Sequence, residues 1–446
     1  MIAAARRNAE ASLLVLSVMI AVGGYWLASL ARSSRVPPRV AGYALLFVGV
    51  YVAAHLAIRR LAPFADPVFL PMAAMLNALG FILIARLDHA PGREVTLAGA
   101  QARWLVVAVA AFIATLWLAR DVRALAQYRY TWALAGVALL LLPILPVLGR
   151  EINGARLWIR LGPLNFQPAE LGKIALVLFF AAYLAERREL LAVATRRLGP
   201  IGIPEIRHFG PVLLAWGVSL IVMVQEKDLG SSLLFFAMFV VMLWTATARP
   251  VYLMSGGVLF AAGAWIAYHL FAHVQARIVV WRRPFAHVTG SGYQIVQSLF
   301  ALATGGAWGT GLGLGRPDLI PSVQTDFIFS AIGEELGLVG TAAVLTAYAL
   351  FSARGFGLAT RARDDFSKLL VAGLSTVFTF QTLLIIAGVT NLVPLTGVTL
   401  PFMSYGGSSL LSNFVLVALL VRVSDEVGRQ VGEGPPTEIG PAGGGR

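Results

Sequence analysis

Long apolar segments recur along almost the whole of this 446-residue chain, and they restrict its fold more than any other feature. The sequence is 58% hydrophobic and only 13% charged, whereas soluble domains are typically about 25% charged. About 20 apolar residues in a helix span the hydrocarbon core of a bilayer. We therefore predict an all-α polytopic membrane protein, because backbone groups in lipid must be paired within each segment.

Twelve segments have the length and composition of transmembrane helices. The segment between the ninth and tenth, residues 273–326, is predicted to be the one large extracellular loop, with a helical pattern over 293–304. No cleavage site follows Arg6 and Arg7, so the first segment is expected to remain in the protein. The twelve segments are residues 12–31, 39–59, 68–86, 103–120, 130–149, 168–186, 210–225, 229–247, 251–272, 327–352, 367–390 and 405–423.

Basic residues set the predicted orientation of the chain, whose formal net charge is +13. With the N-terminus in the cytoplasm, Lys and Arg are more numerous in cytoplasmic segments, as the positive-inside rule requires. Loops near Arg156 and near Arg282 break this bias, and anion binding on the outer face would explain them. The chain has no cysteine, which excludes disulfides and thiolate metal sites, and its six histidines are too scattered for a zinc site.

The stretch Gly305 to Gly340 begins with a glycine-rich polar segment that runs directly into the tenth apolar segment. Asp326 lies at the junction, and Glu334 and Glu335 follow inside the helix. A carboxylate at the wet rim of a membrane can accept a proton from an attacking hydroxyl, so Asp326 is the candidate catalytic residue. The alternative is a helix N-cap, a position at which Asp is common. The stretch lacks the Lys-Ser/Thr ending of a phosphate-binding P-loop.

Charged and aromatic residues form a second cluster just before and inside the sixth segment. Arg156 and Trp158 suit a lipid-linked anion, although a Trp and a snorkelling Arg at a membrane boundary would look the same. Glu170 and Lys173 lie at i,i+3 spacing and can pair on one helix face. Because a lone charge in a span is costly, Lys173 is predicted to pair with Glu334 or Glu335, with Glu170 nearer in sequence.

Residues 391–409 combine two prolines, several glycines and hydroxyl side chains at membrane depth. This composition predicts a broken helix that lines a cavity, because irregular backbone is not tolerated in contact with lipid. Close helix packing through small residues is the alternative. Gln225–Ser232 is a charged turn, for which simple solvent exposure is a sufficient explanation.

Seven motifs, in order over about residues 68–424, resemble those of the shape, elongation, division and sporulation (SEDS) family, which includes RodA, FtsW and SpoVE. The details are most similar to elongation-type RodA members. Two positions depart from the family pattern: Gln324 replaces the usual His, and Glu226-Lys227 replaces a Pro. The motifs are NGARLWI, FQPAELGK, DLGSS, GYQIVQSLFALATGG, GTGLGLG, TDFIFSAIGEELGLVG and PLTGVTLPFMSYGGSSLL.

The resemblance implies a peptidoglycan glycosyltransferase that polymerises lipid II at the outer face of the bacterial cytoplasmic membrane, with undecaprenyl pyrophosphate leaving. It also implies a class B penicillin-binding protein as partner. The family's essential acid falls on Asp326. Arginines at the outer face would stabilise the leaving group, and the need for a divalent cation, Mg²⁺ or Mn²⁺, stays open. The expected substrate-binding residues are Arg156, Trp158, Lys173, Glu335, Arg282, Arg283, Gln297 and Ser404.

The predicted organisation has three parts: an extra transmembrane pair over 1–62, the catalytic membrane domain over 63–426, and a disordered cytoplasmic tail over 427–446. Two other functions use the same features. A lipid II flippase needs polar residues accessible from both sides of the membrane, whereas the distinctive polar motifs here are predicted on one side. A scaffold of the cell-wall machinery needs no acid at position 326.

Overall fold

The computed structural model describes most of the chain, and the described part contains ten helices that are long and apolar enough to cross a membrane. The protein is therefore a multi-pass, predominantly helical membrane protein. The described residues are 2–33, 40–88, 96–145, 148–152, 155–161, 164–192, 196–198, 201–203, 217 and 228–432.

The helices follow the predicted apolar segments. The α-helices are α1 (Ile2–Ser33), α2 (Val40–Leu61), α3 (Phe69–Arg86), α4 (Leu97–Leu118), α5 (Arg129–Leu141), α6 (Ala169–Ala192), α8 (Leu229–Thr247), α9 (Val251–Leu270), α10 (Ala272–Arg282), α11 (Tyr293–Gly305), α12 (Ile328–Arg361), α13 (Asp365–Val389) and α14 (Gly407–Gly432). Short 3₁₀ helices are η1 (Arg123–Tyr128), η2 (Leu142–Ile144), η4 (Pro284–His287) and η5 (Pro317–Leu319).

Ten of the twelve predicted segments correspond to these candidate spans. The sixth segment also forms a helix, α6, but Glu170, Lys173 and Glu186 make it more charged than the ten. The seventh, residues 210–225, lies outside the described residues apart from Gly217. A total of twelve spans therefore stays a prediction. The helix expected over 293–304 is confirmed as α11.

The C-terminal helix continues beyond its predicted end. α14 runs to Gly432, so a tail beginning at residue 427 is wrong by one to two turns. Contacts at Asp425 explain the extension. Its carboxylate accepts a hydrogen bond from the Phe64 N–H (2.7 Å) and pairs with Arg429 one turn later (2.7 Å). Residues 433–446 of the predicted tail lie outside the described part.

Two small antiparallel sheets were not foreseen by the all-α prediction. The first joins α5 to α6 and has the order β1 (Gly149–Ile152), β2 (Ala155–Leu161), β3 (Leu164–Phe166). Ile159 lies opposite Phe166 in it, and both side chains are buried. The second sheet pairs β4 (Arg196–Leu198) with β5 (Ile201–Ile203). Such short strands between spans are hidden by the much stronger hydropathy signal of the helices.

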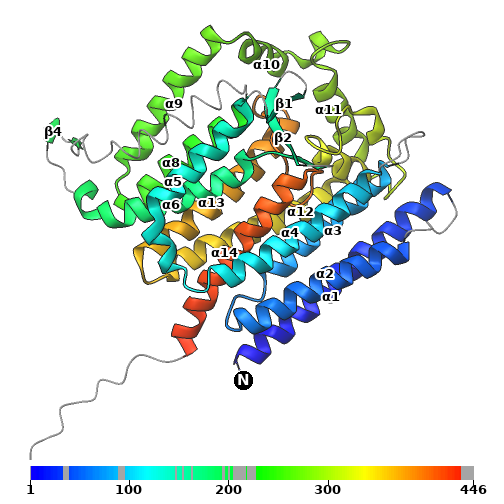
Figure 1. Cartoon of the computed structure of the whole chain (residues 1–446). Helices are drawn as coiled ribbons and strands as arrows, with labels where there is room; N and C mark the ends of the chain where they lie inside the picture. Colours follow the sequence, from blue (N-terminus) through cyan, green and yellow to red (C-terminus); the bar gives the residue numbers. More distant parts are fainter. Residues whose placement is uncertain are drawn as a thin grey trace, which may run out of the picture.

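The helices form a bundle in which neighbours in space are often distant in sequence. α14 packs along α4, and α13 packs against α6 and α8, whereas α12 with α13 and α5 with α6 are neighbours in sequence as well (Figure 1). The N-terminal pair α1–α2 lies on one side of the bundle, where α1 packs on α3 and α2 on α4. α9 is at the opposite edge, and Gly256 is its single buried residue.

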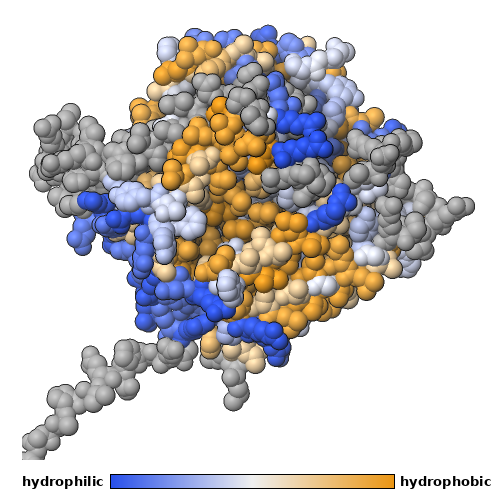
Figure 2. Space-filling model, in the orientation of Figure 1, coloured by the Kyte–Doolittle hydropathy of each residue, from blue (hydrophilic) through white to orange (hydrophobic). Residues whose placement is uncertain are grey.

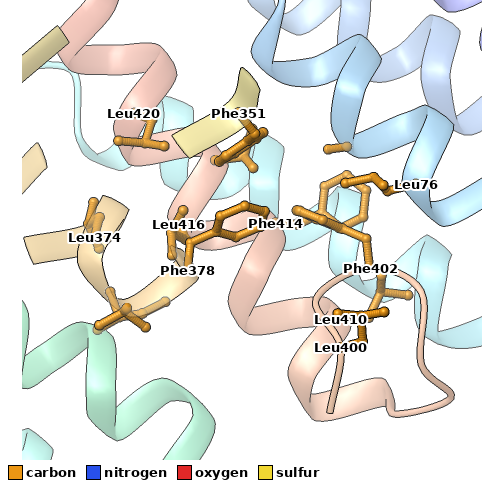
Figure 3. Close-up of a cluster of buried hydrophobic side chains, with 14 of the residues drawn as sticks. Leu76, Phe351, Leu374, Phe378, Leu400, Phe402, Leu410, Phe414, Leu416 and Leu420 are labelled. Carbon is orange, nitrogen blue, oxygen red and sulfur yellow. The ribbon is translucent and has the colours of Figure 1, made fainter. Parts of the chain in front are cut away.

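Aromatic rings from four parts of the chain fill the centre of the bundle. Phe351 of α12 stacks on Phe378 of α13, with ring centroids 4.2 Å apart. Phe402, from the segment before α14, lies between Phe378 and Phe414, at 6.1 and 5.5 Å (Figure 3). Each such pair contributes about 0.5–1.5 kcal/mol beyond area burial. This packing fixes an otherwise irregular segment to the bundle.

The molecular surface matches a protein embedded in lipid. Figure 2 shows a broad hydrophobic zone across the middle of the molecule, with hydrophilic residues gathered toward its lower edge and upper part. Large apolar side chains such as Leu45, Leu134 and Met254 are more than 70% exposed. A soluble protein rarely leaves so much apolar area uncovered, and hydrocarbon tails would cover it here.

Candidate active site

Asp326 lies in the turn between the glycine-rich stretch and α12, outside the transmembrane helix. The N-cap of α12 is Phe327, which makes no side-chain capping hydrogen bond. The alternative that Asp326 is a helix N-cap is therefore wrong. Its backbone N–H donates to the Ser322 carbonyl at 3.3 Å, while the residue lines a cavity.

The loop of residues 306–316, which we call the glycine loop, leads to this turn and depends on its glycines. Four of them have backbone φ angles between 52° and 106°. Side chains are strongly disfavoured in this region, and glycine adopts it at no steric cost. The alternation of glycine with other residues thus reflects the backbone path. The four are Gly306, Gly309, Gly311 and Gly313.

The glycine loop also supplies hydrogen-bond partners to backbone groups at a break in α12. The helix departs from helical geometry at Gly337 (φ 65°, ψ −164°), which frees backbone groups on both sides. The Thr310 N–H donates to the Glu334 carbonyl (2.9 Å), and the Leu338 N–H donates to the Gly306 carbonyl (2.9 Å). Backbone groups freed at membrane depth need such partners. The loop and the first turns of α12 therefore form one hydrogen-bonded unit.

The segment between α13 and α14 is non-helical from residue 391 to 406, as its composition predicted. Asn391 and Gly397 line the same cavity as Asp326, which confirms the predicted broken helix at a cavity. The Ser404 hydroxyl donates to the Thr325 carbonyl and accepts from the Leu400 N–H. These bonds pin the residue before Asp326 to the interior of the bundle.

The cavity at Asp326 has a volume of about 260 Å³ and opens to the outside of the molecule. Its walls come from elements that are separated in sequence: Arg277 and Trp281 from α10, Gln294 from α11, and Asn391 from the segment after α13. Figure 1 shows α10 and α11 at the same end of the bundle as β1 and β2. A carboxylate, a guanidinium, two amides and an indole thus face one space that is close in size to the smaller ligand sites.

The environment of Asp326 raises its pKa to about 6. Removal of the carboxylate from water is the largest cause, because burial disfavours the charged form. The Thr325 hydroxyl and the Arg277 guanidinium oppose the shift, and the nearby Asp228 carboxylate adds to it. A pKa of about 6 leaves the group mostly ionised at neutral pH and makes it more basic than an ordinary aspartate, which suits proton abstraction.

Arg277 is the basic residue that the structure brings to this acid. One Nη donates to the Leu395 carbonyl at 2.8 Å, which orients the guanidinium in the cavity wall. One turn later, the Trp281 indole N–H donates to the Asn391 carbonyl (3.1 Å), and the Asn391 amide returns a bond to the Trp281 carbonyl (3.3 Å). These bonds fasten α10 to the 391–397 segment and close one wall of the cavity.

The other predicted substrate-binding residues whose side chains the structure describes do not line this cavity. Arg282 and Arg283 are exposed at the end of α10. Gln297 is half-buried on α11, one turn after the lining residue Gln294. Trp158 is half-buried in β2. Arg156 lies opposite Glu151 in the sheet, and its side chain is outside the described part of the structure, as are Asn153 and Gly154.

Lys173 is buried in the bundle, and its predicted partner was wrong. Its ammonium contacts the Glu170 carboxylate at 2.7 Å and the Gln381 side-chain carbonyl at 2.8 Å, and neither Glu334 nor Glu335 is its partner. The amide of Gln381 donates to the Thr399 carbonyl (2.8 Å). Lys173 therefore connects α6 and α13 to the segment that lines the cavity.

Glu335 has a different cation from the predicted one, since it pairs with Arg86 at the end of α3. The pair is almost fully buried, and the other Glu335 oxygen accepts from the Gly313 N–H (3.0 Å). Glu334 accepts from the Arg316 N–H (2.6 Å). Both glutamates thus hold the glycine loop, and Glu335, expected to bind substrate, lies beneath that loop.

Sequence reasoning missed Arg277 and Trp281 as members of the candidate site and named Asn391 only within the segment predicted to line a cavity. A signal existed for the first two, because i,i+4 spacing places them on one face of a helix while Arg282 points elsewhere. For Asn391 the signal was the composition of the whole segment 391–409, because its backbone φ of 60° and its bonds to Trp281 emerge only in the fold. In the described part of the chain, no three His, Asp or Glu side chains are grouped to hold a metal ion.

Comparison with known proteins identifies a matching family model and several similar proteins. A family model for cell cycle proteins, named for FtsW, RodA and SpoVE, matches residues 67–428. The peptidoglycan glycosyltransferase RodA of Mycobacterium leprae is 47% identical over 424 residues, which cover 94% of this chain and 90% of that protein. The protein of the same description from Mycobacterium tuberculosis (strain ATCC 25618 / H37Rv) is 46% identical over the same shares.

Two solved structures share the fold. A chain of a peptidoglycan synthase complex, studied for the coordination of polymerization and crosslinking, matches with a TM-score of 0.67 and 27% identity, over 81% of this chain and 98% of that one. The rod shape determining protein RodA of Thermus thermophilus matches with a TM-score of 0.56 and 27% identity, over 81% of this chain and 96% of that one.

Fold and site together define a polytopic membrane protein with an acidic, arginine-containing cavity at one end of its helical bundle. The chain belongs to the SEDS family of FtsW, RodA and SpoVE, as its motifs predicted.

Proposed function

We propose that this protein is a peptidoglycan glycosyltransferase that polymerises lipid II, with Asp326 as the general base. The observation that carries the proposal is the Asp326 carboxylate, in a cavity with Arg277 and with its pKa raised to about 6. Identities of 46–47% over 94% of the chain to proteins described as peptidoglycan glycosyltransferases support the activity.

The reaction joins two saccharides in one displacement. The 4-hydroxyl of a GlcNAc attacks C1 of a MurNAc pyrophosphate, so an O4–C1 bond forms while the bond from C1 to the pyrophosphate oxygen breaks. The hydroxyl proton passes to the Asp326 carboxylate, which is basic enough to accept it at neutral pH. A single displacement inverts the anomeric carbon and converts an α-linked donor into a β-linked chain.

Undecaprenyl pyrophosphate leaves, and its developing negative charge needs a donor that is already in place. Arg277 provides one, because the Leu395 carbonyl orients its guanidinium in the cavity wall. Such preorganised donors stabilise a transition state without reorganisation during the reaction. Arg282 and Arg283, exposed nearby, remain candidates for the outer part of the pyrophosphate or for a second headgroup.

The proposed enzyme works at the outer face of the bacterial cytoplasmic membrane, with residues 273–326 outside. The basic ends of α2 (Arg59 and Arg60) and α12 (Arg361) support a cytoplasmic location for the opposite end of the bundle. A class B penicillin-binding protein is the proposed partner, supported by the likeness to a chain of a peptidoglycan synthase complex.

The test is glycan formation from purified lipid II by the purified protein with its partner, compared with lipid II transport in sealed vesicles. Polymer formation is expected, together with no transport above protein-free vesicles. Transport without polymer would favour the flippase alternative and remove the proposed chemistry.

A further inference from the structure

We propose that the N-terminal pair α1–α2, which precedes the family-matched residues 67–428, is a positioning element for the catalytic end of the bundle. In this proposal α1 fixes the position of the glycine loop, and the loop in turn fixes the position of the first turns of α12, next to Asp326. The inference rests on the proposed function of Asp326, and its test separates the two. The solved relatives extend over only 81% of this chain.

The first step is a direct contact between α1 and the glycine loop. Gly313 approaches the backbone of Ala28 so closely that a Cβ on the glycine would lie 2.8 Å from the Ala28 carbonyl oxygen. Ala28 is buried, with 4% of its surface exposed, although the preceding Leu27 is 59% exposed. One turn earlier, Gly24 lies against Ile82 and near Leu312 of the loop. A helix face made of small residues thus receives the loop.

The second step connects the loop to the start of α12. Gly313, the residue that touches α1, donates its N–H to the Glu335 carboxylate at 3.0 Å. Arg86 pairs with Glu335 and donates to the Gly315 carbonyl. The Arg316 N–H donates to Glu334 at 2.6 Å. A shift of the loop therefore moves both glutamates, which follow Asp326 by eight and nine residues in the first turns of α12.

The third step is an anchor at the other end of α1, which prevents the helix from sliding. Arg7 and Glu10 are buried and paired, and the Glu10 carboxylate also contacts His55 of α2 at 2.7 Å. Arg7 donates to the Ala65 carbonyl, in the connection to α3. The Asp66 N–H next to it donates to Ser424 of α14 at 3.1 Å. Charges are rarely buried in this way without partners, because desolvation is costly.

Between these two ends, α1 is not tightly packed against α12. A cavity of about 120 Å³ separates them, and its walls are apolar, including Ile20 of α1, Leu312 of the loop and Ile332 of α12. The loop meets α1 at Ala28 through Gly313 and near Gly24 through Leu312. A larger side chain at Ala28 is expected to displace the loop toward this space without unfolding the bundle.

The experiment is a size series at position 28, Ala28→Gly, Ala28→Ser, Ala28→Val and Ala28→Leu, in the full chain with its partner. The matched control is Leu27→Phe, which adds bulk at the exposed neighbour. Initial rates of lipid II polymerisation are measured against substrate concentration and pH. We expect kcat to fall with side-chain size, on the order of tenfold at Leu, because a misplacement of about 1 Å can lower a rate by about 100-fold and the displacement here is smaller. KM and the control should stay near wild type.

The pH profile distinguishes positioning from general loosening. A displaced loop admits water beside Asp326, so the acid limb should move below pH 6 in the larger variants and stay unchanged in Leu27→Phe. If kcat and the pH profile are the same in all variants that purify as monodisperse protein, the inference is overturned. Ala28→Ser adds only one heavy atom, so at least this variant is expected to fold. An active Asp326→Asn protein in parallel would instead remove the proposed base, whatever the series shows.

Discussion

Replacing Arg277 by Gln tests the electrostatics of the cavity. The guanidinium lines the cavity with Asp326, and one of its nitrogens donates to the Leu395 carbonyl at 2.8 Å. Glutamine keeps a polar side chain of moderate length but removes the positive charge. Two consequences follow from the structure, one on the rate and one on the pH dependence.

The rate should fall on the order of 100-fold in kcat, the usual scale for removing one preorganised donor from a developing anion. The loss of the Leu395 bond costs about 1 kcal/mol in stability, too little to unfold the protein. Arg277 also holds the pKa of Asp326 down, because a nearby cation favours the carboxylate. Without it the pKa rises above about 6, and the acid limb of the pH–rate profile moves to higher pH.

The assay is chain formation from lipid II between pH 5 and 8, with matched amounts of purified complex. Arg361→Gln is the control, since Arg361 is exposed at the far end of α12 from Asp326 and does not line the cavity. We expect a nearly wild-type rate and pH profile for the control. An Arg277→Gln enzyme with unchanged rate and acid limb, or a control with the larger loss, would refute the assignment of Arg277.

Two further predictions address the bundle and its orientation. Lys173→Ala should lower stability by about 3 kcal/mol because it leaves the Glu170 carboxylate, which is only 13% exposed, without its cation. Thermal melting in detergent should show Glu170→Gln recovering part of the loss and Glu334→Gln adding to it. Full additivity with Glu170 would contradict the pairing. A cysteine introduced at the exposed Gly290 should react only with reagent added outside the cell, and labelling solely from the cytoplasmic side would reverse the proposed orientation.

Features that depend on local chemistry were predictable from the sequence. Ten spans, the helix at 293–305 and the broken helix before α14 follow from hydropathy, helical period, glycine and proline. The position of Asp326 at the rim of a span was predictable because a polar loop leads into the apolar segment there, and its role as the base stays a proposal. Its raised pKa was not, since desolvation depends on α10, α11 and the 391–397 segment surrounding it.

Features that depend on which elements meet were not predictable. The sequence predicted an ion pair between Lys173 and Glu334 or Glu335. In the structure α6, which carries Lys173, packs on α13, while Glu335 of α12 pairs with Arg86 of α3. The sequence contains several carboxylates that could pair with a buried lysine, and it does not show which of them lies next to it. Likewise, Arg282 and Arg277 are chemically equal in the sequence, and the orientation of α10 decides that Arg277 lines the cavity.

The most direct test of the central claim is polymerisation of lipid II by Asp326→Asn. Asparagine keeps the shape of the side chain but is a far weaker base, and because Asp326 does not cap α12 the change should leave the fold intact. We predict a protein that purifies with its partner and forms glycan at least on the order of 100-fold more slowly, the scale of general base catalysis. Near-normal glycan chains from Asp326→Asn would contradict the account.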